Sequence, residues 1–317
     1  MLNIVFMGTP DFARESLEAI YNEGYNILKV ITNPDRPKGR GMKLVQSPVK
    51  EFAIEKNIEV LQPEKVKGNK ELIEELKKTN PDIICVVAYG KILPNEILEI
   101  PRFGCINVHG SLLPQYRGAA PIQWSILNGD KKTGITTIYM DSGMDTGDII
   151  LKEEVDIGDD ETTGELWERL SKLGGQALVK TLKKIENGTV TREKQGEDFS
   201  MAPMLNKEMS KIDWDNQSAI QIKNLVRGLN PIMGAYTYLN DKKIKFWKVD
   251  ICNTLDSNQY MDKENGTVIL SDSKKGLFVK TKEGILSILE IQGENAKRMK
   301  IFDFLRGNSI DENNKFM

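Results

Sequence analysis

The sequence is poor in the two side chains that most often bind transition metals. It contains a single histidine, His109, and three widely spaced cysteines, Cys85, Cys105 and Cys252. Structural zinc sites are usually built from several closely spaced cysteines and histidines, and disulfide frameworks use an even number of cysteines. We therefore expect no metal site, and we predict that the three cysteines are reduced thiols buried in strands.

Long apolar segments are also missing. No run approaches the about 20 apolar residues that a membrane-spanning helix needs, and the N-terminal residues lead directly into Gly8-Thr9-Pro10 without a basic leader or a cleavage site. The hydrophobic fraction of 39% and the charged fraction of 28% are those of an ordinary globular protein. These features predict a cytoplasmic protein that does not contact a membrane, and nothing in them requires more than a monomer.

The charge is nearly balanced overall but is unevenly distributed. The net charge is -2, whereas residues 207–317 carry 18 basic and 15 acidic side chains and residues 1–206 carry 26 and 31. A mildly basic C-terminal part is compatible with nucleic-acid binding, although a slight excess of charge is weak evidence by itself.

Hydrophobic patterning in the first half predicts an α/β domain. Residues 2–6 have the pattern of a buried strand, and Gly8-Thr9-Pro10-Asp11 then leads into apolar residues at helical spacing. Further apolar runs alternate with helical stretches at residues 47–56 and 69–78, as expected for parallel strands with crossover helices. These runs cover residues 27–32, 58–61, 83–87 and 103–108. The predicted fold is Rossmann-like, but Gly-x-Gly-x-x-Gly is missing after the first strand, so the fold implies no nicotinamide cofactor.

The rest of the chain predicts a second, smaller domain. A helix at residues 118–128 is followed by strands at 134–139 and 147–155 and by a long amphipathic helix at 162–187. Residues 190–206 lack a sustained period and are predicted to be a linker. A helix at 216–227 then precedes short strands typical of a small β-barrel, at 235–239, 243–249, 266–270, 276–280 and 285–291. The predicted domains are therefore residues 1–189 and 207–317.

The candidate catalytic residues lie at the carboxyl end of the strand at 103–108. Asn107 and His109 are two positions apart, so on a strand they lie on the same face. Histidine is the side chain that changes charge near neutral pH. Ligands of open α/β sheets bind beyond the carboxyl ends of the strands, where a later loop can bring an aspartate. The loop at 141–148 offers Asp141, Asp145 and Asp148. Two alternatives stay open: the histidine fills space beside a strand end, or the aspartates only form a turn, which fits Asp145 least well.

The segment from Asn107 to Trp124, taken together with Asp145 in Met-Asp-Thr-Gly-Asp, resembles the 10-formyltetrahydrofolate-dependent formyltransferases. The resemblance is strongest to the members that act on methionyl-tRNA. Residues 6–13 and 34–41 match the same family, so the likeness extends over essentially the whole chain. The specific part is Ser-Leu-Leu-Pro joined to Arg-Gly-Ala-Ala-Pro-Ile, since Asn-x-His alone is common.

The resemblance implies a catalytic triad of Asn107, His109 and Asp145. In such a reaction an amine attacks the formyl carbon, an oxyanion forms, and the folate nitrogen leaves. The Asn107 amide then donates to the oxyanion, and a protonated His109 donates to the same oxygen and passes a proton to the leaving nitrogen. Asp145 orients the imidazole and takes the proton of the amine through a water. The roles of His109 and Asp145 are interchangeable at this level.

The same resemblance implies the substrates. It predicts 10-formyltetrahydrofolate as a co-substrate without a tightly bound cofactor, and a folate-contacting turn made of Ser111, Leu112, Leu113 and Pro114. It predicts initiator methionyl-tRNA as the acceptor, in translation initiation, with the basic loop at residues 33–50 reaching the acceptor stem. The candidate contacts in this loop are Arg36, Lys38, Arg40 and Lys43. A solvated excursion of the chain is the alternative for this loop.

The C-terminal barrel is expected to be an OB-like domain that lies along the tRNA. Lysines 242, 243, 245 and 248 interleave with Phe246 and Trp247 on one predicted strand, which a solvated face over a core aromatic would also explain. The alternative functions are a formyltransferase acting on a ribonucleotide or an amino sugar, a formyl-folate hydrolase, and an inert folate- or RNA-binding protein.

Overall fold

The computed structural model describes residues 1–38 and 42–317, and the contacts divide them into two compact units. The first unit contains Met1–Pro121, Lys132–Asp156 and Trp167–Pro203, and the second contains Ile122–Lys131, Ile157–Leu166 and Met204–Met317. Among the described helices, none combines the length and the apolar character of a membrane span.

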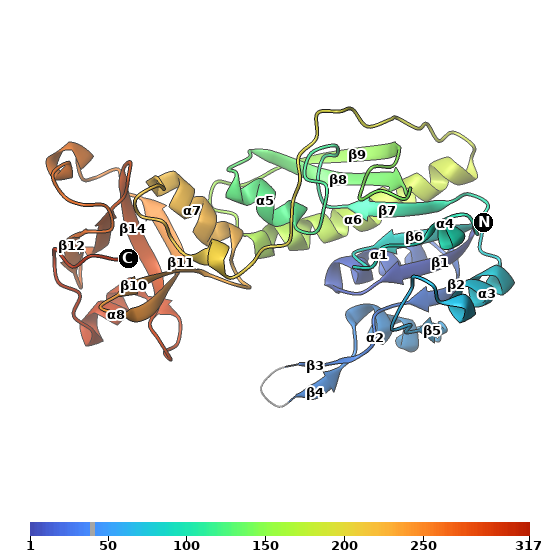
Figure 1. Ribbon diagram of the computed structural model, residues 1–317, viewed down its shortest axis with the longest axis horizontal. Coiled ribbons are helices and arrows are strands. Elements are labelled where there is room, and N and C mark those ends of the chain that lie inside the picture. The colour runs from blue at the N-terminus through green and yellow to red at the C-terminus, as the bar shows by residue number, and fades with distance from the viewer. Residues whose placement is uncertain (39–41) are drawn as a thin grey trace. The chain divides into compact units, whose positions relative to one another are not determined.

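A mixed seven-stranded sheet forms the centre of the first unit (Figure 1). Its strands in spatial order are β5 (Val60–Leu61), β2 (Asn26–Ile31), β1 (Asn3–Gly8), β6 (Ile83–Val87), β7 (Cys105–His109), β8 (Lys132–Tyr139) and β9 (Ile149–Asp156). The strands from β5 to β7 pair in parallel, which confirms the predicted arrangement, and β8 and β9 are antiparallel additions. The parallel strands have the spatial order of a doubly wound sheet.

Helices cover both faces of this sheet. They are α1 (Asp11–Asn22), α2 (Pro48–Glu55), α3 (Lys70–Thr79), α4 (Asn95–Leu98) and the greater part of α6 (Thr163–Glu186), while α5 (Pro121–Leu127) lies mostly in the second unit. Every residue of β6 is buried, as expected for a strand covered on both sides. The apolar run at 83–87 is therefore readable from the sequence because this strand is fully enclosed.

Alternation along β7 decides which way the candidate residues point. A Cβ on Gly174 of α6 would lie 3.2 Å from a methyl group of Val108, so Val108 faces α6. Cys105 instead packs in a core cluster with Leu72 of α3 and Ile97 of α4. Since side chains alternate along a strand, the two residues on either side of Val108 point to the face that carries Cys105.

Residues 33–50 contain a short hairpin, and the prediction of an irregular loop is wrong for this part of the chain. Strands β3 (Arg36–Lys38) and β4 (Lys43–Val45) pair antiparallel. Three-residue strands rich in proline and lysine carry no hydrophobic alternation, so no sequence signal marked them. Arg40 lies outside the described residues, and only the backbones of Lys38 and Lys43 are described.

The second unit contains an antiparallel sheet. Its order is β10 (Ala235–Leu239), β11 (Lys242–Ile251), β14 (Ile285–Gln292), β13 (Gly276–Lys280) and β12 (Val268–Asp272), with β15 (Met299–Lys300) paired to β14. Helices α7 (Ala219–Gly228) and α8 (Ile301–Gly307) accompany it. The rings of Trp214, Phe246 and Phe316 meet in its core at centroid distances of 5.5 to 6.3 Å.

The cysteines are free thiols, as predicted. Cys85 and Cys105 are buried in β6 and β7, and desolvation raises the pKa of Cys105 to about 12, so this thiol stays protonated. Cys252 follows β11 and is only half-buried, so the prediction of a buried strand position is wrong for it.

Candidate active site

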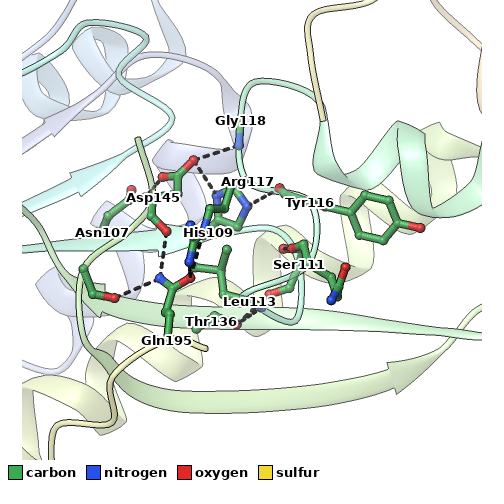
Figure 2. Close-up of polar contacts among 12 residues, drawn as sticks. Asn107, His109, Ser111, Leu113, Tyr116, Arg117, Gly118, Thr136, Asp145 and Gln195 are labelled. Atoms are coloured by element: carbon green, nitrogen blue, oxygen red, sulfur yellow. Dashed lines mark hydrogen bonds and ion pairs between the residues drawn. The ribbon is translucent and has the colours of Figure 1, made fainter. Parts of the chain in front are cut away.

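The end of β7 places two polar side chains at the carboxyl edge of the parallel sheet. Asn107 and His109 lie on the same face of this strand, and β7 runs parallel to β6 with Val108 opposite Val87. Both side chains are drawn in Figure 2, where they lie beside Asp145. The topology therefore delivers them to the place where doubly wound sheets bind ligands.

Asp145 reaches this edge from the loop that joins β8 to β9. Its backbone has a φ of 55°, in the left-handed region that aspartate tolerates better than most residues. The loop is tight, because a Cβ on Gly147 would lie 1.7 Å from the carbonyl oxygen of Tyr139. This geometry turns the Asp145 carboxylate toward β7.

The Asp145 carboxylate has a separate partner on each oxygen. Its Oδ1 accepts a hydrogen bond from Nδ2 of Asn107 at 3.2 Å, and its Oδ2 accepts one from the backbone N–H of Gly118 at 2.9 Å. Oδ2 also faces Nδ1 of His109 at 3.6 Å. The structure thus brings together the three residues that the resemblance implies as a triad: two from strand β7, and Asp145 from a loop that lies 38 residues beyond Asn107.

The orientation of the His109 imidazole is fixed by Nε2, the ring nitrogen that does not face Asp145. Nε2 of His109 lies 2.9 Å from the carbonyl oxygen of Tyr116, and a carbonyl only accepts hydrogen bonds, so Nε2 donates. Nδ1 is then the ring nitrogen that faces Asp145. The histidine is 5% exposed, and both of its ring nitrogens face polar atoms, which argues against a side chain that only fills space.

The turn after β7 is held by buried hydrogen bonds. The Ser111 hydroxyl donates to the carbonyl of Gln115 at 2.6 Å, and the Thr136 hydroxyl donates to the carbonyl of Ser111 at 2.6 Å. The N–H of Leu113 donates back to the Thr136 oxygen at 3.0 Å. Ser111 and Leu113 are buried, whereas Leu112 and Pro114 are partly exposed. The surface that this turn offers to a ligand therefore comes from its backbone, Leu112 and Pro114.

A segment that sequence reasoning missed also lies against this turn. Residues 193–202, which we call the strap, belong to the predicted linker. The Ser200 side chain accepts from the N–H of Tyr116 at 2.9 Å, and the N–H of Ala202 donates to the carbonyl of Arg117 at 2.7 Å. The strap contacts backbone atoms in an irregular conformation, so no periodicity could have revealed its place.

The neighbouring aspartates differ in role. Oδ1 of Asp141 accepts from the N–H of Gly143 at 3.0 Å and from the Thr146 hydroxyl at 2.6 Å, which confirms the turn interpretation for Asp141. The carbonyl of Asp148 accepts from the N–H of Tyr139 at 2.9 Å, a backbone contact that supports the same loop.

The root of the β3–β4 hairpin is anchored by a polar clamp. Asp35 accepts hydrogen bonds from Lys50 at 2.6 Å and from Gln62 at 2.8 Å, and these bonds hold the pKa of its carboxyl below the usual value. Lys50, a basic residue of the predicted loop, is therefore committed to Asp35. Beyond the root, Arg36 is exposed, as are the apolar side chains of Met42 and Leu44.

The second unit carries an aromatic and basic face on β10 and β11. The ammonium of Lys243 lies 3.5 Å from the ring centre of Tyr236, and Lys245 and Arg298 lie 5.4 and 5.3 Å from that of Trp247. Phe246 points the other way and is fully buried. Of the two aromatic residues predicted on this strand, Phe246 lies in the core and Trp247 lies on the outer face.

No group of three or more histidine, cysteine, aspartate or glutamate side chains is placed to hold a metal ion anywhere in the described parts of the chain.

Comparison with known proteins gives two family models. A model described as "Formyl transferase" matches residues 2–182, and one described as "Formyl transferase, C-terminal domain" matches residues 204–309. A protein from Ruminiclostridium cellulolyticum named methionyl-tRNA formyltransferase is 49% identical over 99% of both chains. One of the same name from Clostridioides difficile is 52% identical over 98% of both chains.

Solved structures agree in fold. A sugar 3N-formyl transferase, WlaRD, crystallised in the presence of dTDP and 5-N-formyl-THF, matches with a TM-score of 0.65 at 21% identity, over 94% of this chain and 99% of its own. HypX from Aquifex aeolicus in complex with tetrahydrofolic acid matches with a TM-score of 0.63 at 14% identity, over 98% of this chain and 50% of its own. At these identities the likeness concerns the fold alone.

Proposed function

Because the chain belongs to the methionyl-tRNA formyltransferase family, we propose that it transfers the formyl group of 10-formyltetrahydrofolate to the α-amino group of methionyl initiator tRNA. The observation that carries the proposal is the convergence of Asn107, His109 and Asp145 at the carboxyl edge of the sheet. These groups are the donors and the base that an acyl transfer from a formyl amide requires.

Asn107 stabilises the oxyanion. Its amide carries two hydrogens, of which one is directed to Asp145, and we assign the other to the formyl oxygen. The bond to Asp145 fixes the amide before substrate arrives, so no reorganisation is needed as charge develops. A preorganised donor of this kind contributes roughly 10²- to 10³-fold in rate.

His109 and Asp145 handle the proton. The amine loses a proton as it attacks the formyl carbon, and the folate nitrogen needs one as it leaves. Nδ1 of His109 and Oδ2 of Asp145 face each other at 3.6 Å, so an imidazole protonated at Nδ1 forms an ion pair with the carboxylate. The tether from Nε2 to the Tyr116 carbonyl keeps Nδ1 directed at this carboxylate through the cycle.

The co-substrate is 10-formyltetrahydrofolate, which binds and leaves in each turnover. We place its contact on the turn of Ser111, Leu112, Leu113 and Pro114. Leu112 and Pro114 offer partly exposed apolar surface, while Ser111 and Leu113 hold the turn from inside. Leu112 and the backbone of this turn then present the formyl carbon to the triad.

The tRNA is bound by basic surfaces. We assign Arg36, Lys38, Arg40 and Lys43 of the hairpin region to the acceptor stem, where phosphate contacts give salt-dependent affinity. The antiparallel second unit is proposed to be an OB-like domain, with the lysines and aromatic rings of β10 and β11 as its nucleic-acid face. Residues 1–189 then form a Rossmann-like catalytic domain, 190–206 the linker and 207–317 the tRNA-binding domain of a cytoplasmic monomer.

The test is a formyl-transfer assay with radiolabelled initiator methionyl-tRNA and 10-formyltetrahydrofolate. Elongator methionyl-tRNA and a set of amino sugars serve as competing acceptors. We expect formylation of the initiator alone. Transfer to a sugar amine instead, or folate binding with no transfer to any acceptor, would overturn the proposal.

A further inference from the structure

The strap contacts the loop of Asp145 through one side chain. Nε2 of Gln195 donates to the backbone carbonyl of Asp145 at 2.7 Å and to that of Gly147 at 2.8 Å, as Figure 2 shows for Asp145. The two bonds use both hydrogens of the amide, so the side chain is fully engaged with this loop. Gln195 therefore touches the residue that bears the carboxylate, on its backbone side.

Gln195 is itself held by a buried arginine. Both Nε and Nη2 of Arg117 donate to Oε1 of Gln195, at 2.9 and 2.7 Å. Arg117 is 8% exposed, and its guanidinium lies over the ring of Phe199 at 4.6 Å. Two bonds to one oxygen fix the rotation of the amide, so its hydrogens point at the two carbonyls. The order of contacts is Arg117, Gln195, then the backbone of Asp145.

The backbone of Asp145 adopts a conformation that an external restraint stabilises. Its φ of 55° lies in the left-handed region, which is strained for a residue other than glycine although aspartate tolerates it better than most, and the hydrogen bonds inside the loop run to the Asp141 side chain. The carboxylate follows the backbone, and it must meet Asn107, Gly118 and His109 at once. A restraint on the Asp145 carbonyl is therefore a restraint on the carboxylate.

We propose that Gln195 is a positioning residue for Asp145, that Arg117 acts through it, and that the strap thereby completes the active site. The proposal rests on the proposed function only where activity is measured. It assigns a role in chemistry to a segment whose other described contacts hold the turn after β7.

The first test compares two identical substitutions in the same region. Gln195→Met removes both bonds to the loop of Asp145, whereas Gln115→Met removes a single bond from Gln115 to the carbonyl of Asp198 on the strap. We expect Gln195→Met to lower kcat on the order of 10- to 100-fold, since a small misplacement of a catalytic group has this effect. The KM values for both substrates should change little, and Gln115→Met should keep nearly the parental kcat.

Gln195→Asn is run in parallel as a milder change, because it keeps the amide but shortens its reach. We expect the same fall in kcat in a chain with nearly parental thermal stability. A parental kcat in Gln195→Asn and Gln195→Met would overturn the proposal, and so would equal losses in Gln195→Met and Gln115→Met.

A double-mutant cycle tests the order of contacts. If Arg117 acts through Gln195, then Arg117→Met combined with Gln195→Met should lower kcat no further than Gln195→Met alone. Multiplicative losses would show that Arg117 acts independently and would contradict this part of the proposal.

The last test needs no substrate. His109 is the only histidine, so histidine labelled with ¹⁵N gives one imidazole spectrum that reports on its surroundings. At a fixed pH we expect Gln195→Met to move the signals in the direction that Asp145→Asn moves them, and Gln115→Met to leave them in place. Unmoved signals in Gln195→Met would overturn the inference. If the signals move but no methionyl-tRNA is formylated, the proposed function fails while the positioning role stands.

Discussion

The candidate active site and the β3–β4 hairpin belong to the same unit but differ in exposure and in the number of contacts that hold their side chains. In the candidate active site, His109 is 5% exposed and Asn107, His109 and Asp145 all contact polar groups of the protein. On the hairpin, Met42 and Leu44 are 68% and 71% exposed, and the clamp of Asp35, Lys50 and Gln62 holds only its root. The residues that we propose for chemistry thus lie where the geometry is fixed, and those that we propose for tRNA recognition lie where the surface is exposed.

The largest expected effect tests the chemical half of this comparison. His109→Ala should lower kcat on the order of 10²- to 10⁴-fold, because it removes the group that carries the proton at Nδ1. Arg36→Ala on the hairpin should instead raise the KM for tRNA and leave kcat nearly unchanged. Steady-state kinetics with both substrates varied would separate the effect on kcat from the effect on KM. A fall in kcat for Arg36→Ala would contradict a role of Arg36 in tRNA binding alone.

The same leucine-to-alanine change should have unequal costs in the two regions. Leu113 is 1% exposed in the turn after β7, so Leu113→Ala should lower the free energy of unfolding by about 2–5 kcal/mol. Leu44 is 71% exposed, so Leu44→Ala should change it by less than about 0.5 kcal/mol. Urea unfolding of both variants measures the difference, and comparable losses would show that the hairpin is part of the core.

A smaller effect concerns the root of the hairpin. Gln62→Leu removes the bonds from Gln62 to Asp35 and to the carbonyl of Asn33, at 2.8 and 2.9 Å. At about 1 kcal/mol for each of the two hydrogen bonds, the KM for tRNA should rise by up to about thirtyfold, with kcat retained. The matched change Gln217→Leu, in the second unit, removes a bond from the backbone N–H of Asp213 and serves as the control. A fall in kcat would mean that the clamp also supports the catalytic edge of the sheet.

The smallest effect concerns the side-chain hydroxyl of Tyr89. The backbone carbonyl of this residue accepts a hydrogen bond from Asn33 beside the hairpin root, and a change of side chain leaves that bond in place. Its buried hydroxyl has no hydrogen-bond partner among the described residues, and burial raises its pKa from 10.0 to about 12. Tyr89→Phe should therefore keep the clamp and raise the free energy of unfolding by about 1 kcal/mol.

The pH dependence of Tyr89 follows from its raised pKa. The protonated phenol is favoured in the folded state, so its contribution to stability is complete below pH 10 and is lost as the pH rises toward about 12. Between pH 10 and about 12, the thermal midpoint Tm should fall less steeply with pH in Tyr89→Phe than in the parent chain. Equal slopes of Tm against pH would contradict the raised pKa of Tyr89.

The sequence predicted those parts of the fold in which burial leaves a pattern, either a helical or strand period or a continuous apolar run. Strand β6 is buried at every residue and its bounds match the predicted run at 83–87. Likewise the lone histidine beside Asn107 at a strand end predicted a site, and the resemblance of this segment to the formyltransferases implied its chemistry. The structure adds the geometry that joins them to Asp145.

What could not be predicted lacks any period. The strap contacts the site through Gln195 and backbone carbonyls, and neither a lone glutamine nor a carbonyl leaves a pattern in the sequence. The hairpin is similarly hidden, because Arg-Pro-Lys and Lys-Leu-Val are too short to alternate. The choice of Nδ1 as the working nitrogen of His109 depends on the Tyr116 carbonyl, seven residues away in the chain.

The most direct test of the division between chemistry and recognition is the single-turnover rate of formyl transfer at saturating initiator methionyl-tRNA. His109→Ala and Gln62→Leu are measured beside the parent chain. We predict that saturation restores the parental rate to Gln62→Leu and leaves His109→Ala slower on the order of 10²-fold or more. A parental rate in His109→Ala, or a slow rate in Gln62→Leu that saturation does not restore, would contradict the account.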